Sequence, residues 1–103
     1  VADSGDSPAR EVSTRATTIP VRIAESCLTV MDTGVMVMET GNPNAAPDAL
    51  TGMYLAHAAL RSALHIVRHN LPDVESQQTR EEIAGRVAEV ETDADAVFEQ
   101  VNQ

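Results

Sequence analysis

The stretch that decides the fold is residues 48–71, "DALTGMYLAHAALRSALHIVRHNL". Its apolar residues recur at alternating steps of three and four, the spacing that places side chains on one face of an α-helix. We therefore predict a helix from Asp48, its N-cap, to about His69. The main row is Leu50, Met53, His57, Leu60, Leu64, Val67 and Leu71. A neighbouring row of small residues and one isoleucine permits close approach of another helix: Ala56, Ala59, Ala63 and Ile66.

The segment before it predicts a second helix over residues 19–40. Thr18 is a suitable N-cap, Pro20 falls in the first turn, and Gly41 supplies the stop. Two apolar rows interleave within this helix, so its apolar face is wider than contact with one neighbouring helix needs. One row is Ile23, Cys27, Val30, Gly34 and Val37, and the other is Ala24, Leu28, Met31, Val35 and Met38.

The second helix contains "MDTGV" at residues 31–35. Its Asp-Thr-Gly resembles the catalytic triad of aspartic proteases, and "IAGR" at residues 83–86 resembles their second motif. That resemblance implies an all-β fold. Helical periodicity runs unbroken through both motifs, so we predict helices at both places and no protease.

A third helix is predicted after "NLPD" at residues 70–73, with Asp73 as its cap or with a restart at Thr79. Its seam is Ile83, Val87, Val90, Ala94, Val97 and Val101. The fold class is thus all-α. We expect a flexible arm over residues 1–18 and, over residues 19–103, an antiparallel three-helix bundle of up-down-up topology completed by dimerisation.

Charge limits the classes of partner. The formal net charge is −9, and residues 71–103 hold nine acidic residues against two arginines. Direct binding of nucleic acid or of anionic lipid needs a basic surface, so neither is expected. No apolar run is long enough to span a bilayer, and the single cysteine fits a reducing compartment, so we predict a cytoplasmic protein.

Motifs for catalysis or cofactors are sparse. His65 and His69 share a helix face at the spacing used for zinc, but two solvated histidines near a helix C-terminus, where positive charge is favoured, explain them better, so we predict no metal and no cofactor. No nucleophile elbow or phosphate loop occurs, and we predict a protein that is not an enzyme. His57 differs because it occupies the apolar seam, where protonation would loosen the bundle as the pH falls.

Two binding functions follow. The first is an adaptor or regulatory protein that binds another protein, or a second copy in a homodimer, through an apolar helix face. The residues expected there are Met31, Val35, Met36, Met38 and Met53. The alternative is an acidic inhibitor that mimics nucleic acid through the third helix and occupies the basic groove of a DNA- or RNA-binding protein. Within that helix Glu82 can pair with Arg86, four residues on. Its acidic face is Glu81, Glu82, Glu89, Asp93, Asp95 and Glu99.

Overall fold

The computed structural model of the chain describes the backbone of residues 8–102 and the side chains of residues 14–102. It contains three long helices, α1 (Pro8–Glu39), α2 (Ala46–Asn70) and α3 (Gln77–Val101). A short 3-10 turn, η1 (Leu71–Asp73), joins α2 to α3. No strand occurs among the described residues, so the predicted all-α class with three helices is confirmed.

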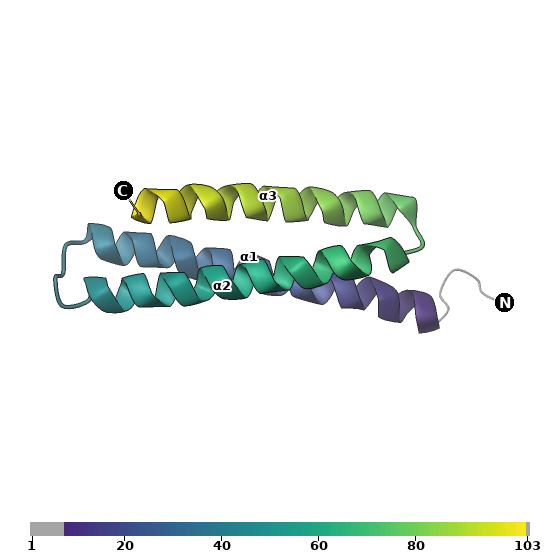
Figure 1. The fold of residues 1–103 in the computed structure, drawn as a ribbon, viewed down its shortest axis with the longest axis horizontal. Helices are drawn as coiled ribbons and strands as arrows, with labels where there is room; N and C mark the ends of the chain where they lie inside the picture. The colour runs from purple at the N-terminus through teal and green to yellow at the C-terminus, as the bar shows by residue number, and fades with distance from the viewer. Residues whose placement is uncertain (1–7, 103) are drawn as a thin grey trace.

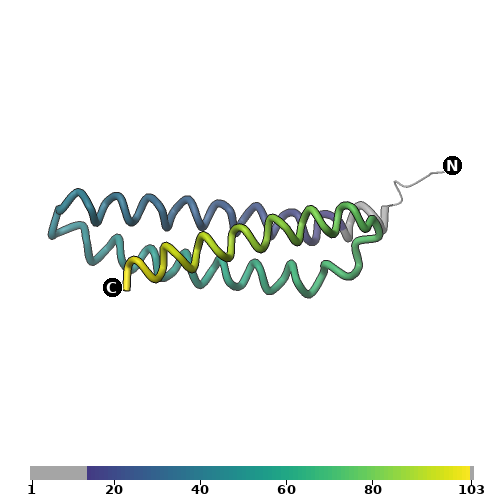
Figure 2. Tube along the Cα trace, turned by 90° about the horizontal axis from the view of Figure 1, so that it is seen from above, coloured from purple at the N-terminus to yellow at the C-terminus, as the bar shows by residue number. Residues whose placement is uncertain are grey.

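The helices form an elongated body of 61 × 19 × 18 Å. The chain reverses direction between α1 and α2, which run next to each other in Figure 2 and cross near their middle in the view of Figure 1. Helix α3 lies above this pair, and Figure 2 shows that it crosses the pair obliquely. One face of the α1–α2 pair is therefore covered by α3, and no described element covers the opposite face.

Helix α1 begins at Pro8, about three turns before the predicted start at residue 19. The expected arm is therefore helical from Pro8 onwards, and its residues 1–7 lie outside the described part. No Gly or Pro interrupts residues 9–18. Tertiary packing also fixes this segment, because Thr17 is fully buried. Its hydroxyl is satisfied within the helix, where it donates to the Thr14 carbonyl at 2.7 Å.

Pro20 thus lies inside α1 instead of in its first turn. Proline has no N–H, so the carbonyl of Ala16, four residues earlier, loses its usual helical donor. The side chain of Asn70 replaces that donor, because its Nδ2 lies 3.0 Å from the Ala16 oxygen. The end of α2 therefore supports the continuity of α1 at its proline.

Replacing Asn70 by alanine should lower the free energy of unfolding by about 1–2 kcal/mol, because the Ala16 carbonyl loses its donor. In a Pro20→Ala background the backbone N–H returns, and the same change should cost well under half as much. Chemical denaturation of the four proteins measures this coupling. Equal costs in both backgrounds would show that Asn70 does not compensate for the proline.

Of the other helix ends, one lies where the sequence predicts it and two differ. Gly41 adopts φ 79° and ends α1, as predicted. Helix α2 begins two residues early, at Ala46, so Asp48 lies in its first turn and is not the cap. The cap of α3 is neither Asp73 nor Thr79 but Ser76, whose hydroxyl accepts the Thr79 backbone N–H at 3.2 Å.

The core lies along the contact of the three helices. The α3 seam is buried at its first four positions, and α2 buries most of its main row, both as the periodicity predicts. The core residues are Val21, Ala24, Met31, Met53, Ala56, Leu60, Ala63, Leu64, Val67, Val74, Ile83, Val87, Val90 and Ala94.

Among the residues whose side chains are described, two ion pairs tie α3 to the other helices. Arg86 binds the Glu25 carboxylate of α1 through two nitrogens, at 2.6 and 3.1 Å. Arg68 of α2 binds Glu91 of α3 at 2.7 Å. The predicted pairing of Arg86 with Glu82 is wrong, because Arg86 is drawn across to α1.

Candidate functional site

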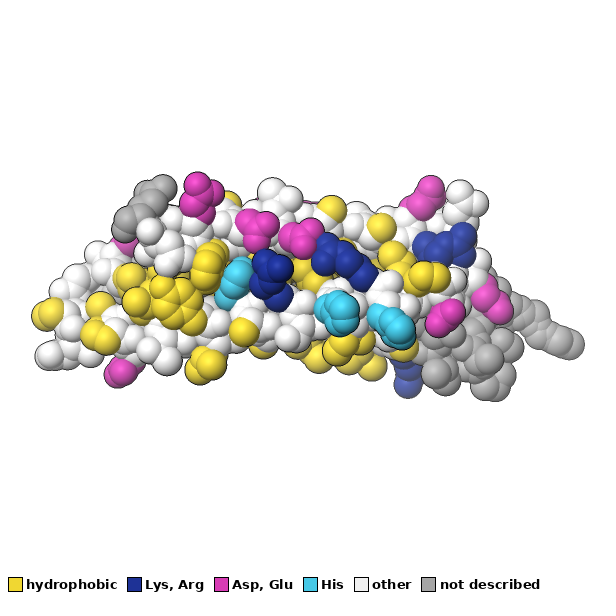
Figure 3. All heavy atoms as spheres, viewed as in Figure 1, with side chains coloured by type: hydrophobic (Ala, Val, Ile, Leu, Met, Phe, Trp, Pro, Cys, Tyr) yellow, Lys and Arg dark blue, Asp and Glu magenta, His cyan; other side chains and the backbone are white. Residues whose placement is uncertain are grey.

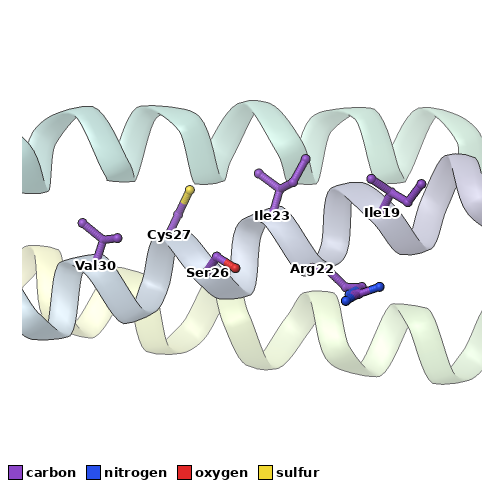
Figure 4. Close-up of a pocket in the computed structure, with 6 residues that line it drawn as sticks. All are labelled: Ile19, Arg22, Ile23, Ser26, Cys27 and Val30. Atoms are coloured by element: carbon purple, nitrogen blue, oxygen red, sulfur yellow. The ribbon is translucent and has the colours of Figure 1, made fainter.

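A row of exposed apolar side chains runs along α1. Ile19, Ile23 and Val30 are 51%, 50% and 53% exposed. Figure 4 shows these side chains and Cys27 on the side of α1 nearest α2, with Arg22 directed toward α3. Together with Ser26 and Arg22 they line a hollow of about 410 Å³.

The hollow continues onto α2. A second hollow, of about 470 Å³, is lined by Ile19 and Pro20 of α1 and by Ile66 of α2. Ile66 is 47% exposed. We call this surface the α1–α2 groove and define it by Ile19, Ile23, Cys27 and Val30 of α1 and Ile66 of α2.

Helical geometry places the groove on the face away from α3. On α1, Ile23 lies two residues before Glu25, which binds α3 through Arg86, so the two side chains diverge by about 160°. On α2, Ile66 lies two residues before Arg68, which binds α3 through Glu91, and diverges from it equally. The groove therefore opens onto the face of the α1–α2 pair that α3 leaves uncovered.

The groove is apolar and contains one thiol. Isolated apolar residues are normal on a protein surface, whereas large contiguous apolar patches are typical of interaction sites. Cys27 is half-buried here, and its burial raises the pKa of the thiol above the ordinary value of 9.0. The thiol is therefore protonated near neutral pH and behaves as a small apolar side chain.

Most of the residues that the sequence predicts to form an exposed methionine-rich surface are buried or half-buried. Met31 and Met53 are 0% and 2% exposed, so both belong to the core and the prediction for them is corrected. Val35 and Met38 are half-buried and face the end of α3. Met36 is 66% exposed but lies about 120° around α1 from Val30, outside the groove.

The apolar periodicity of α1 includes the groove residues of this helix, but the sequence predicted other residues as the exposed binding surface. Of the two apolar rows in α1, the row with Met31 faces the core, whereas Ile23 and Val30 of the other row are exposed and only its Gly34 is buried, against α2. A helix that contacts α2 and α3 on one side cannot bury both rows. Ile19 and Ile66 extend the exposed row, and only three-dimensional packing shows that they belong to it.

The acidic residues named from the sequence are all exposed along α3. Figure 3 shows acidic side chains over α3 and a row of arginine and histidine side chains across the middle of the same face. Among the described residues, no three or more His, Cys, Asp or Glu side chains are grouped so that they could hold a metal ion. Within the same residues, no helix is long and apolar enough to cross a membrane.

These features define the class of protein as a helical bundle domain with one uncovered apolar helix-pair face. The family profile described as formiminotransferase-cyclodeaminase matches residues 6–89, which is most of the chain. The chain belongs to this family. The chain itself matches no curated protein and no solved structure. The family is named for an enzyme, so the prediction of a protein that is not an enzyme is not confirmed.

Proposed function

We propose that this chain is an association domain of the formiminotransferase-cyclodeaminase family, and that a second copy of the chain covers the α1–α2 groove. The observation that carries the proposal is the exposure of Ile19, Ile23, Val30 and Ile66 on one continuous face. Fully burying a side chain of this size contributes about 1.5–3 kcal/mol. About half of each of these four side chains is exposed, and two chains would bury both sets, so their burial would drive association strongly.

A second copy fits this face better than an unrelated partner. Two such faces together give an antiparallel arrangement of four helices, the common way to bury helix pairs that each expose one side. The faces are also compatible in charge, since the α1 hollow is lined by one charged residue, Arg22, beside five uncharged ones. The assembly would complete the up-down-up bundle with α3 on the outside of each copy.

Replacing Ile23 by aspartate should dissociate this assembly. Two carboxylates, one from each copy, would enter an apolar interface without partners, so the dissociation constant should rise at least 100-fold. Light scattering over a wide concentration range should give the mass of a dimer for the unmodified chain and 11.0 kDa for the variant.

Met36→Asp is the matched control, since it places the same charge on the same helix outside the groove, at a side chain that is 66% exposed. It should remain dimeric. Circular dichroism of each variant should show that the helices are intact. A monomeric unmodified chain at high concentration, or equal masses for the two variants, contradicts the proposal.

A basic partner bound through α3 is the second candidate, supported by the exposure of all six acidic residues named from the sequence. The two candidates differ in their response to salt. Association through the groove should persist or strengthen as salt is added, whereas binding through α3 should weaken steeply because its charges are screened.

A further inference from the structure

The aromatic side chains of the chain meet at one point between α2 and α3. The sequence has one tyrosine and one phenylalanine, and the Tyr54 and Phe98 rings pack edge to face with centroids 5.6 Å apart. The His57 ring stacks on the same Phe98 with a centroid distance of 4.0 Å and an interplanar angle of 15°. We call these three rings the latch cluster: His57, Tyr54 and Phe98.

The latch cluster fastens the C-terminal end of α3. The Tyr54 hydroxyl donates to Oδ1 of Asn102 at 2.8 Å. Asn102 caps α3, because its Nδ2 donates to the Phe98 carbonyl at 2.9 Å. A single group of contacts therefore joins the last turn of α3, its cap and α2.

His57 is the member of the cluster whose charge can change near neutral pH. Its Nε2 is buried and has no hydrogen-bond partner among the described residues. A neutral imidazole tolerates this position, because one ring nitrogen is only an acceptor. A protonated imidazole would place an N–H donor and a charge there, and a buried donor without a partner is costly.

The surrounding charges act in both directions. Arg61 on α2 repels the imidazolium, and Asp95 on α3 attracts it; α1 contributes no described charge that shifts it. Burial, with the field of Arg61 in support, lowers the pKa of His57 below the ordinary value of 6.5, and Asp95 opposes the shift. The attraction of Asp95 is therefore weaker than the two unfavourable effects.

We propose that His57 is a pH-sensitive latch for the C-terminal end of α3, whose protonation separates the imidazole from Phe98 and releases the last turns of α3 from α2. The α1–α2 pair and its groove remain folded, since the groove lies on the other face. The latch thus operates independently of the association proposed above.

The sign of the pH dependence follows from the two states. Well above pH 6.5 the imidazole is neutral in both the docked and the released state, so protonation does not weaken docking. As the pH falls below 6.5, the released state takes up a proton before the docked state does, and docking weakens. It weakens no further once the pH is below the pKa of the docked imidazole.

The fluorescence of Tyr54 tests the latch directly, because the chain has no tryptophan and this is its one tyrosine. Acidification from pH 8 should change the tyrosine emission in a transition that lies below pH 6.5, while far-UV circular dichroism keeps most of its helical signal. Simultaneous loss of the helical signal would show global unfolding and would overturn the proposal.

Four variants separate the latch from the titration of carboxylates. His57→Phe keeps an aromatic ring but cannot titrate, so the transition should vanish, whereas the control His65→Phe, at an exposed histidine of the same helix, should retain it. Asp95→Asn removes the compensating charge, so release should begin about half a pH unit higher. Arg61→Gln relieves the repulsion, so release should need a correspondingly lower pH.

A persistent transition in His57→Phe would overturn the proposal. So would an imidazole that titrates at or above pH 6.5 when followed by NMR of the histidine ring. If His57→Phe does not fold, the Asp95→Asn and Arg61→Gln variants still test the proposal, because the pH of release should shift in opposite directions in the two. If His57 had only a structural role, the pH of release would shift in neither variant.

Discussion

Replacing Met31 by aspartate is expected to unfold the domain. Met31 is fully buried on α1 within the common core of the three helices. The change removes a large apolar side chain, which costs about 2–5 kcal/mol, and places an unpaired carboxylate in the cavity, which costs several more. Domains of this size are stabilised by about 5–15 kcal/mol in total, so little or no folded protein should remain.

Met36→Asp, five residues further along the same helix, is the control and should change the free energy of unfolding by less than about 0.5 kcal/mol. Thermal unfolding followed by circular dichroism distinguishes the two variants. A Met31→Asp protein that folds normally would show that this methionine does not lie in the core.

Replacing Gly34 by leucine should also destabilise the domain strongly. A Cβ at this position would collide with Cγ of Met53 and lie 2.6 Å from its Sδ, and Met53 is itself buried. Overpacking of this kind lowers the free energy of unfolding by about 1–3 kcal/mol. The higher helix propensity of leucine raises it by less than about 1 kcal/mol. We expect a net loss of about 2 kcal/mol, measured by chemical denaturation.

Gly85→Ala on α3 is the matched control, because a Cβ there meets nothing within 4 Å. It should stabilise the chain by about 0.5–1 kcal/mol, the usual gain when alanine replaces glycine inside a helix. Met53→Ala should relieve much of the cost of Gly34→Leu when the two are combined. Additive losses in the double variant would refute the collision.

The glycine also explains the Asp-Thr-Gly motif. Gly34 is the small residue that lets α1 approach Met53 of α2, and it lies inside a continuous helix. Periodicity over the whole segment therefore predicted the local structure correctly, where a three-residue motif resembled an unrelated fold. The same periodicity predicted the buried seam of α3 and the main row of α2, because spacing alone determines which residues share a helix face.

Sequence reasoning failed where tertiary contacts decide. The start of α1 was misplaced because Pro20 resembled a first-turn proline, and only Asn70, from the far end of the hairpin, satisfies the carbonyl that it leaves free. The candidate site was misassigned for a related reason. Two apolar rows on one helix are equivalent in the sequence, and the positions of α2 and α3 together determine which residues of each row are buried.

The most direct test of the association proposal is the alkylation rate of Cys27 as a function of protein concentration, at a pH high enough to ionise the thiol. Cys27 is the one cysteine of the chain and lines the groove. We predict that its rate falls as the solution mass doubles, whereas a cysteine placed at Met36 in a Cys27→Ser background reacts at one rate throughout. A doubling of mass with no change in the rate at Cys27 would place the interface elsewhere and contradict the account.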